Sequence, residues 1–126
     1  MMKQTLRYIG NFIELGYDHH PDPPSLVAGR GKLDPAIKPQ VLAYLRAGNM
    51  LIFSPGVDDD VLDPARRSDS PSIRMDGTYC WPQTLAYYVD RYDVELPAEF
   101  IAHARANDWQ VPVVDPLSVQ TPRYPG

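Results

Sequence analysis

The 126-residue chain holds a single cysteine, Cys80, and therefore cannot form an internal disulfide. It has no apolar run near the roughly 20 residues that span a membrane. Its N-terminus also lacks the apolar core of a secretory signal peptide. We therefore expect a cytoplasmic protein, in a reducing compartment, that has no membrane partner.

Basic residues are not in excess, because 12 lysines and arginines face 16 aspartates and glutamates, for a net charge of −4. Each half of the chain carries six basic and eight acidic side chains, so the sequence has no basic tail or basic half. Nucleic-acid binding depends on such a basic region to neutralise phosphates. The charge pattern therefore predicts no nucleic-acid partner.

Proline is abundant, with 14 residues, and 44% of the chain is apolar, which is enough for a folded core. The length is typical of one domain, which we predict to span residues 1–126. Proline recurs in residues 110–126, and such a segment favours extended backbone. We predict a C-terminal arm there that either lies over the body or ends free.

Three parts of the sequence have the composition of β-strands. Residues 6–15 are rich in β-branched and aromatic side chains, which predicts a bulged strand or a tight hairpin. The wholly apolar run 50–53 predicts a buried central strand. Residues 72–75 and 78–81 flank Asp76-Gly77, which favours a type I′ hairpin turn with positive φ at both positions.

Three helices are predicted over residues 39–47, 82–92 and 97–106, each with a proline at its start. In the second helix apolar side chains repeat with helical spacing at Leu85, Tyr88, Val89 and Tyr92. Strands and helices mix without a regular alternation. We therefore predict an α+β fold, with a small, mostly antiparallel sheet, about three helices packed on one side and long proline-rich loops.

Four aspartates lie close together in an irregular stretch, at Asp58, Asp59, Asp60 and Asp63. They do not match an EF-hand calcium loop, because Asp63 stands at the sixth position, where that loop requires glycine. One interpretation is a solvated loop in which the aspartates cap turns. The other is an acidic patch that steers a basic protein partner toward the chain.

Eight tyrosines and two tryptophans outnumber three phenylalanines, a bias typical of contact surfaces as well as of small cores. Tyr87 and Arg91 are four residues apart, on a face of the predicted helix that differs from its apolar face. Tyr87 then either covers a neighbouring loop or, together with Arg91, anchors a protein partner.

Asp18-His19-His20 combines carboxylate and imidazole groups, which can bind a divalent metal. Adjacent side chains diverge, however, and the triplet runs directly into prolines, so a solvated loop is the main interpretation. The alternative is a small metal-dependent hydrolase in which these residues meet the aspartates of residues 58–63 in space.

Nucleophilic catalysis finds little support in the sequence. Cys80 lies within a predicted strand, where a buried thiol is typical. Ser54 precedes a proline and does not lie in a Gly-x-Ser-x-Gly turn. His103 is expected at the surface boundary of the third helix. Residues 29–32 lack the remaining glycine and the Ser or Thr of a phosphate-binding loop. We therefore predict no catalytic residues, no metal and no cofactor.

One stretch carries a more specific pattern. It comprises Asp76-Gly77-Thr78-Tyr79-Cys80-Trp81-Pro82, Leu85-Ala86-Tyr87-Tyr88, Tyr92 and Leu96-Pro97-Ala98-Glu99-Phe100, preceded by the strand from Asn49 to Pro55. This stretch resembles small, acidic bacterial proteins, some of which look like immunity proteins of secreted toxins. Because the matching residues are turns, helix starts and core aromatics, the resemblance implies a fold and no catalytic residues.

Together, the composition and the resemblance imply a non-enzymatic protein-binding domain, a bacterial immunity protein that covers the active site of a cognate toxin. Proline-fixed loops favour tight binding because they lose little entropy on docking. The expected binding residues, which steer and anchor a basic secreted toxin, are Asp58, Asp59, Asp60, Asp63, Tyr87 and Arg91. The metal-dependent hydrolase and a domain that acts within a homo-oligomer are the alternatives.

Overall fold

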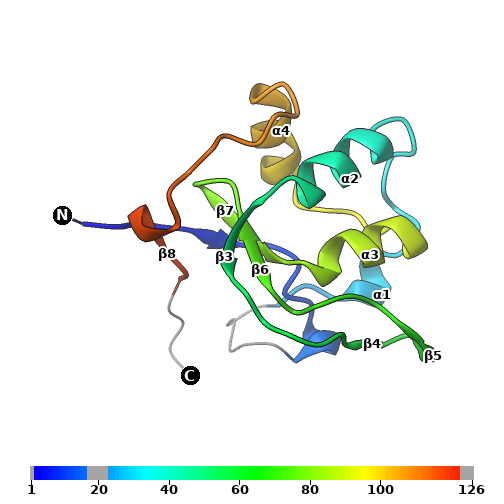
Figure 1. The fold of residues 1–126 in the computed structure, drawn as a ribbon. Helices are drawn as coiled ribbons and strands as arrows, with labels where there is room; N and C mark the ends of the chain where they lie inside the picture. The colour runs from blue at the N-terminus through cyan, green and yellow to red at the C-terminus, as the bar shows by residue number, and fades with distance from the viewer. Residues whose placement is uncertain (1, 17–22, 123–126) are drawn as a thin grey trace.

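The computed structural model describes residues 2–16 and 23–122 and confirms the predicted α+β class (Figure 1). In chain order the elements are β1 (Gln4–Thr5), β2 (Arg7–Tyr8), the 3-10 helix η1 (Ile13–Leu15), α1 (Leu26–Gly29), α2 (Lys38–Arg46), β3 (Asn49–Ile52), β4 (Asp59–Asp60), β5 (Asp63–Arg67), β6 (Ile73–Met75), β7 (Tyr79–Pro82), α3 (Thr84–Tyr92), α4 (Ala98–Ala106), the 3-10 helix η2 (Pro116–Ser118) and β8 (Val119–Gln120). The three longer helices lie within two residues of their predicted bounds.

The main sheet has four strands in the order β2-β7-β6-β3. The pairs β6–β7 and β3–β6 are antiparallel, whereas β2 runs parallel to β7. Two smaller sheets accompany it, the parallel pair β1–β8 and the antiparallel hairpin β4–β5. The sheets are therefore mostly antiparallel, as the sequence predicts.

The predicted hairpin around Asp76-Gly77 is present as β6 and β7, with Met75 opposite Cys80. Gly77 has a φ of 94°, which favours glycine, but Asp76 does not have a positive φ. The predicted type I′ turn is therefore wrong, because that turn needs positive φ at both positions.

The expectation for residues 6–15 is confirmed at Arg7–Tyr8, which form strand β2, and wrong for residues 13–15. The chain passes from β1 to β2, which pair with different strands, and residues 13–15 form the 3-10 helix η1. The carboxylate of Glu14 accepts hydrogen bonds from the backbone N–H of Leu26 at 2.8 Å and of Val27 at 3.2 Å. Its partners belong to the first turn of α1, so this segment caps a helix instead of continuing a strand.

The apolar run 50–53 does not form the central strand that its composition predicts. Among the described strands, β3 pairs with β6 alone and lies at the edge of the sheet. Ile52 is 49% exposed and Phe53 is 73% exposed. The prediction fails because apolar composition does not reveal which strands become neighbours in space.

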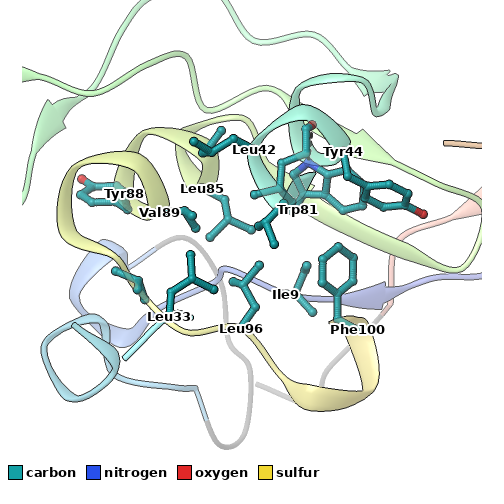
Figure 2. Close-up of a cluster of buried hydrophobic side chains, with 14 of the residues drawn as sticks. Ile9, Leu33, Leu42, Tyr44, Trp81, Leu85, Tyr88, Val89, Leu96 and Phe100 are labelled. Atoms are coloured by element: carbon teal, nitrogen blue, oxygen red, sulfur yellow. Dashed lines mark hydrogen bonds between the residues drawn. The ribbon is translucent and has the colours of Figure 1, made fainter. Parts of the chain in front are cut away.

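The core lies between one face of the main sheet and helices α2, α3 and α4, which matches the predicted one-sided packing (Figure 2). Trp81 of β7 is fully buried there, and its indole N–H donates to the carbonyl of Leu45 at 3.1 Å. Its ring lies 5.7 Å from that of Phe100. A Cβ at Gly48 would lie 2.6 Å from the tryptophan ring, so glycine permits this close approach.

The opposite face of the sheet carries a smaller cluster, which consists of Leu6, Met75, Cys80 and Val119. Val114 of the C-terminal segment packs against it. Asn49 of β3 donates to the carbonyl of Pro112 at 2.9 Å and accepts from the N–H of Val114 at 3.3 Å. Within residues 110–122 the proline-rich arm therefore lies over the body.

Candidate protein-binding surface

Three of the four aspartates of residues 58–63 lie on the strands of the β4–β5 hairpin, and Asp58 directly precedes β4. Asp60 closes its turn, because Oδ1 accepts from the backbone N–H of Leu62 at 2.7 Å and of Asp63 at 3.2 Å. The N–H of Asp58 donates to the carbonyl of Asp69 at 2.9 Å, which continues the pairing beyond the strands. The irregular stretch predicted from the sequence is thus an ordered hairpin.

Helix α3 holds this hairpin with three tyrosine hydroxyls. Oδ2 of Asp60 accepts from Tyr92 at 2.5 Å and from Tyr87 at 2.8 Å. The hydroxyl of Tyr88 accepts from the N–H of Val61 at 3.1 Å. Because Asp60 is fully buried, these bonds compensate for the lost hydration of its carboxylate.

The pKa values of this cluster favour a charged carboxylate and neutral phenols. Burial raises the pKa of Asp60, but the hydrogen bonds from Tyr92, Tyr87 and two backbone N–H groups outweigh it and lower the pKa below its ordinary value. Burial, followed by the hydrogen bond to Asp60, raises the pKa of Tyr87 to about 12. The network is therefore in its fully bonded form at neutral pH.

Arginines compensate the acidic side chains of the hairpin. Arg91 lies 3.9 Å from the Asp60 carboxylate and 3.8 Å from that of Asp63. Asp63 also pairs with Arg66 at 3.2 Å, and Asp59 with Arg67 at 3.9 Å. The hairpin thus carries acidic side chains that are paired with arginines, so the acidic patch, one of the two interpretations of the sequence, is partly neutralised.

The structure brings four of the six predicted binding residues into one network, namely Asp60, Asp63, Tyr87 and Arg91. Asp59 is exposed on the same hairpin, and Asp58 is half-buried at its base. The predicted role of Asp60 in partner binding needs a correction, because its carboxylate is fully buried. It bonds to its own turn and to α3 and does not face a partner. Two interpretations were given for Tyr87, that it covers a neighbouring loop or that it anchors a partner. Its hydroxyl donates to Asp60 of the hairpin, which agrees with the first.

Sequence reasoning assigned Tyr88 and Tyr92 to the apolar face of α3 and missed their polar role. Both rings are buried, and both hydroxyls reach the hairpin. A signal was available, because a buried tyrosine hydroxyl needs a hydrogen-bond partner whereas leucine at the same position does not. The partner itself lies 27 to 32 residues earlier in the chain, which spacing does not reveal.

A second buried carboxylate, Asp76, was also missed. Its Oδ1 accepts from the N–H groups of Thr78 at 2.9 Å and Tyr79 at 2.7 Å. Its Oδ2 accepts from the Tyr44 hydroxyl at 2.6 Å and lies 3.1 Å from Nε2 of His103. Burial, followed by the bond to Asp76, raises the pKa of Tyr44.

The pair of Asp76 and His103 has the residue types of a general-base dyad, but its bonds tie structural elements together. Asp76 closes the β6–β7 turn, Tyr44 belongs to α2 and His103 belongs to α4. Three surface hollows, with volumes of about 600, 370 and 280 Å³, are lined by other residues. The bonds of Asp76 thus cross-link the β6–β7 turn, α2 and α4.

Within residues 2–16 and 23–122, no group of three or more His, Cys, Asp or Glu side chains converges as a metal site would require. The predicted triplet Asp18, His19 and His20 lies outside the described residues. In the same described part, no helix has the length and apolar character to cross a membrane. Comparison with family models, curated proteins and solved structures found no match.

Proposed function

We propose that this chain is a non-enzymatic protein-binding domain, of the kind found in bacterial immunity proteins, and that it covers the active site of a cognate toxin. One observation carries the proposal, which is the anchoring of the charged β4–β5 hairpin to α3 through the buried Asp60 carboxylate. The hairpin displays Asp59, Arg67 and the apolar side chain of Val61 to solvent.

The anchoring supports binding because a rigid surface loses little conformational entropy when a partner docks. Exposed aspartates and arginines on one hairpin also favour specificity, since each charge attracts one sign and repels the other. The net charge of −4 adds a weak, long-range attraction for a basic protein. Arg91 of α3 lies beside Asp63 of the hairpin and is partly exposed, so we expect it to bind a carboxylate of the partner.

The experiment uses proteins encoded by the genes adjacent to that of this chain. Each is purified and titrated with the chain by calorimetry, and growth of cells producing it is followed with and without the chain. We expect one neighbour to be toxic and to bind with a Kd below about 1 μM. A set of neighbours that neither bind nor impair growth overturns the proposal.

The surface assignment is tested with Asp59→Lys combined with Arg67→Glu, which reverses an exposed ion pair on the hairpin. We expect affinity for the toxin to fall at least about tenfold. Glu99→Lys combined with Arg105→Glu, which also exchanges two exposed charges and keeps the net charge, is the matched control on α4 and should leave affinity within about twofold. Equal effects of the hairpin and control variants would place the interface elsewhere.

A further inference from the structure

The outer edge of β3 is apolar and uncharged. Residues 47–57 contain no lysine, arginine, aspartate or glutamate. Within this segment Met50 is 37% exposed, Ile52 is 49% exposed and Phe53 is 73% exposed. In Figure 1 this segment runs from β3 toward the β4–β5 hairpin.

Sheet edges in monomeric proteins are usually protected, because unpaired backbone groups are a template for another strand. Charged side chains, and lysine above all, are the commonest protection, and this edge has none. Two milder devices are present, a register shift between Met50 and Ile52 and the proline at position 55. The C-terminal arm also reaches this strand, because it bonds to the Asn49 side chain and η2 contacts β3. Pairing is therefore limited to the short stretch around Ile52 and Phe53.

We infer that the β3 edge pairs, antiparallel and about a two-fold axis, with the β3 edge of a second copy of this chain. The two four-stranded sheets then form one continuous sheet, and Ile52 and Phe53 of each copy become buried against the other. An edge strand is self-complementary in this arrangement, because antiparallel pairing exchanges the same donors and acceptors in both directions. The uncharged sequence means that no like charges meet within the paired strands.

The exposed apolar area sets the strength of this dimer. Met50, Ile52, Phe53 and Val57 together expose on the order of 400 Å² per copy, or about 800 Å² for the pair. Stable interfaces bury about 1,200–2,000 Å², so this apolar patch alone falls below that range and fits a weak interface. The result is a reversible dimer whose population rises with concentration.

A second copy fits this edge better than a basic partner does. The acidic side chains that attract a basic protein lie on the β4–β5 hairpin, and the edge of β3 offers none. The inference therefore concerns a different surface from the proposed toxin interface and stands independently of it. Its failure would leave the hairpin assignment unaffected.

The test measures the mass of the full chain by light scattering and sedimentation over a concentration series from about 1 μM to 1 mM, which brackets a weak interface. We expect a shift from the mass of one chain toward that of two. Ile52→Lys places a charge on the edge and should weaken dimerisation at least about tenfold. Val27→Lys, at a 57% exposed position on α1, is the control and should dimerise like the unaltered chain.

Phe53→Lys is a second variant in case Ile52→Lys loses stability, since Phe53 is the more exposed side chain. It should weaken dimerisation as well, and a melting temperature close to that of the unaltered chain shows that the fold is retained. A chain that stays monomeric throughout the series overturns the inference. A dimer that both lysine variants leave intact overturns it too, because the contact then lies on another surface.

Discussion

Asp60 and Asp76 lie in different parts of the molecule and make nearly the same set of bonds. Each uses Oδ1 to accept two backbone N–H groups of its own turn, at 2.7 and 3.2 Å for Asp60 and at 2.9 and 2.7 Å for Asp76. Each uses Oδ2 to accept tyrosine hydroxyls and to face a basic side chain. In both places one buried aspartate thus closes a turn with Oδ1 and connects that turn to a helix or helices with Oδ2.

The two aspartates differ in which elements their hydrogen bonds connect. Asp76 closes the hairpin between two strands of the main sheet and connects it to α2 and α4. Asp60 closes a peripheral two-stranded hairpin and connects it to α3 alone. The loss of Asp76 should therefore affect the whole fold, and the loss of Asp60 mainly one hairpin.

The largest effect is expected for Asp76→Ala, which leaves the Tyr44 hydroxyl, two backbone N–H groups and His103 without their acceptor. The free energy of unfolding should fall by about 3–5 kcal/mol, measured by urea denaturation. Asp76→Asn keeps an acceptor for the turn and should lose less. A loss below about 1 kcal/mol for the alanine variant would mean that the cluster does not connect the helices to the sheet.

Asp60→Ala should release the β4–β5 hairpin while the main sheet stays folded. Trypsin is the probe, because Arg66 and Arg67 lie exposed on β5. We expect cleavage there to accelerate at least about tenfold, since local opening exposes the backbone to the protease. Asp59→Asn, which leaves the Asp60 bonds in place, is the control and should be cleaved at the rate of the unaltered chain.

Alkaline pH offers a finer comparison of the same hairpin. Because the folded-state pKa of Tyr87 is raised to about 12, its contribution to stability is complete below the ordinary tyrosine pKa of about 10. That contribution is lost as pH rises from about 10 through about 12, because deprotonation breaks the bond to Asp60. Tyr87→Phe should show a smaller loss of stability over this interval. The check is urea denaturation at several pH values, and parallel losses in both proteins would contradict the assignment.

The smallest effect is expected for the exposed pair of Asp59 and Arg67, whose charged atoms lie 3.9 Å apart. Solvent screens such pairs, so Arg67→Gln should change the free energy of unfolding by less than about 0.5 kcal/mol. This variant separates structure from recognition on the hairpin, because its effect on toxin affinity should exceed its effect on stability. A larger loss of stability would show that the ion pair, and not Asp60 alone, holds the hairpin.

The parts of the fold that could be predicted depend on local physics. Helix periodicity placed α2, α3 and α4 within two residues, and Asp76-Gly77 placed a hairpin. Proline marks the start of α2 and α4, but Pro82, which was predicted to open α3, ends β7 instead. Apart from the turn type at Asp76-Gly77, the main errors concern long-range relations. β3 has the composition of a central strand and lies at an edge, and residues 13–15 have the composition of a strand and cap a helix through Glu14.

The candidate site divides in the same way. Sequence alone identified the aspartates and the pair of Tyr87 and Arg91 as notable, because charge and helical spacing are visible in the chain. It could not show that Asp60 is buried, since the hydroxyls that bind it come from a helix about 30 residues later.

The sequence by itself determined where the three longer helices and the hairpin at Asp76-Gly77 form, and which side chains are able to form hydrogen bonds, because backbone preferences and side-chain chemistry act over a few residues. Only the tertiary structure decided which of two similar aspartates connects the core and which connects a peripheral hairpin. It also decided that the most apolar strand lies exposed at an edge. Burial and strand neighbours depend on contacts between distant segments, and those contacts exist only once the chain has folded.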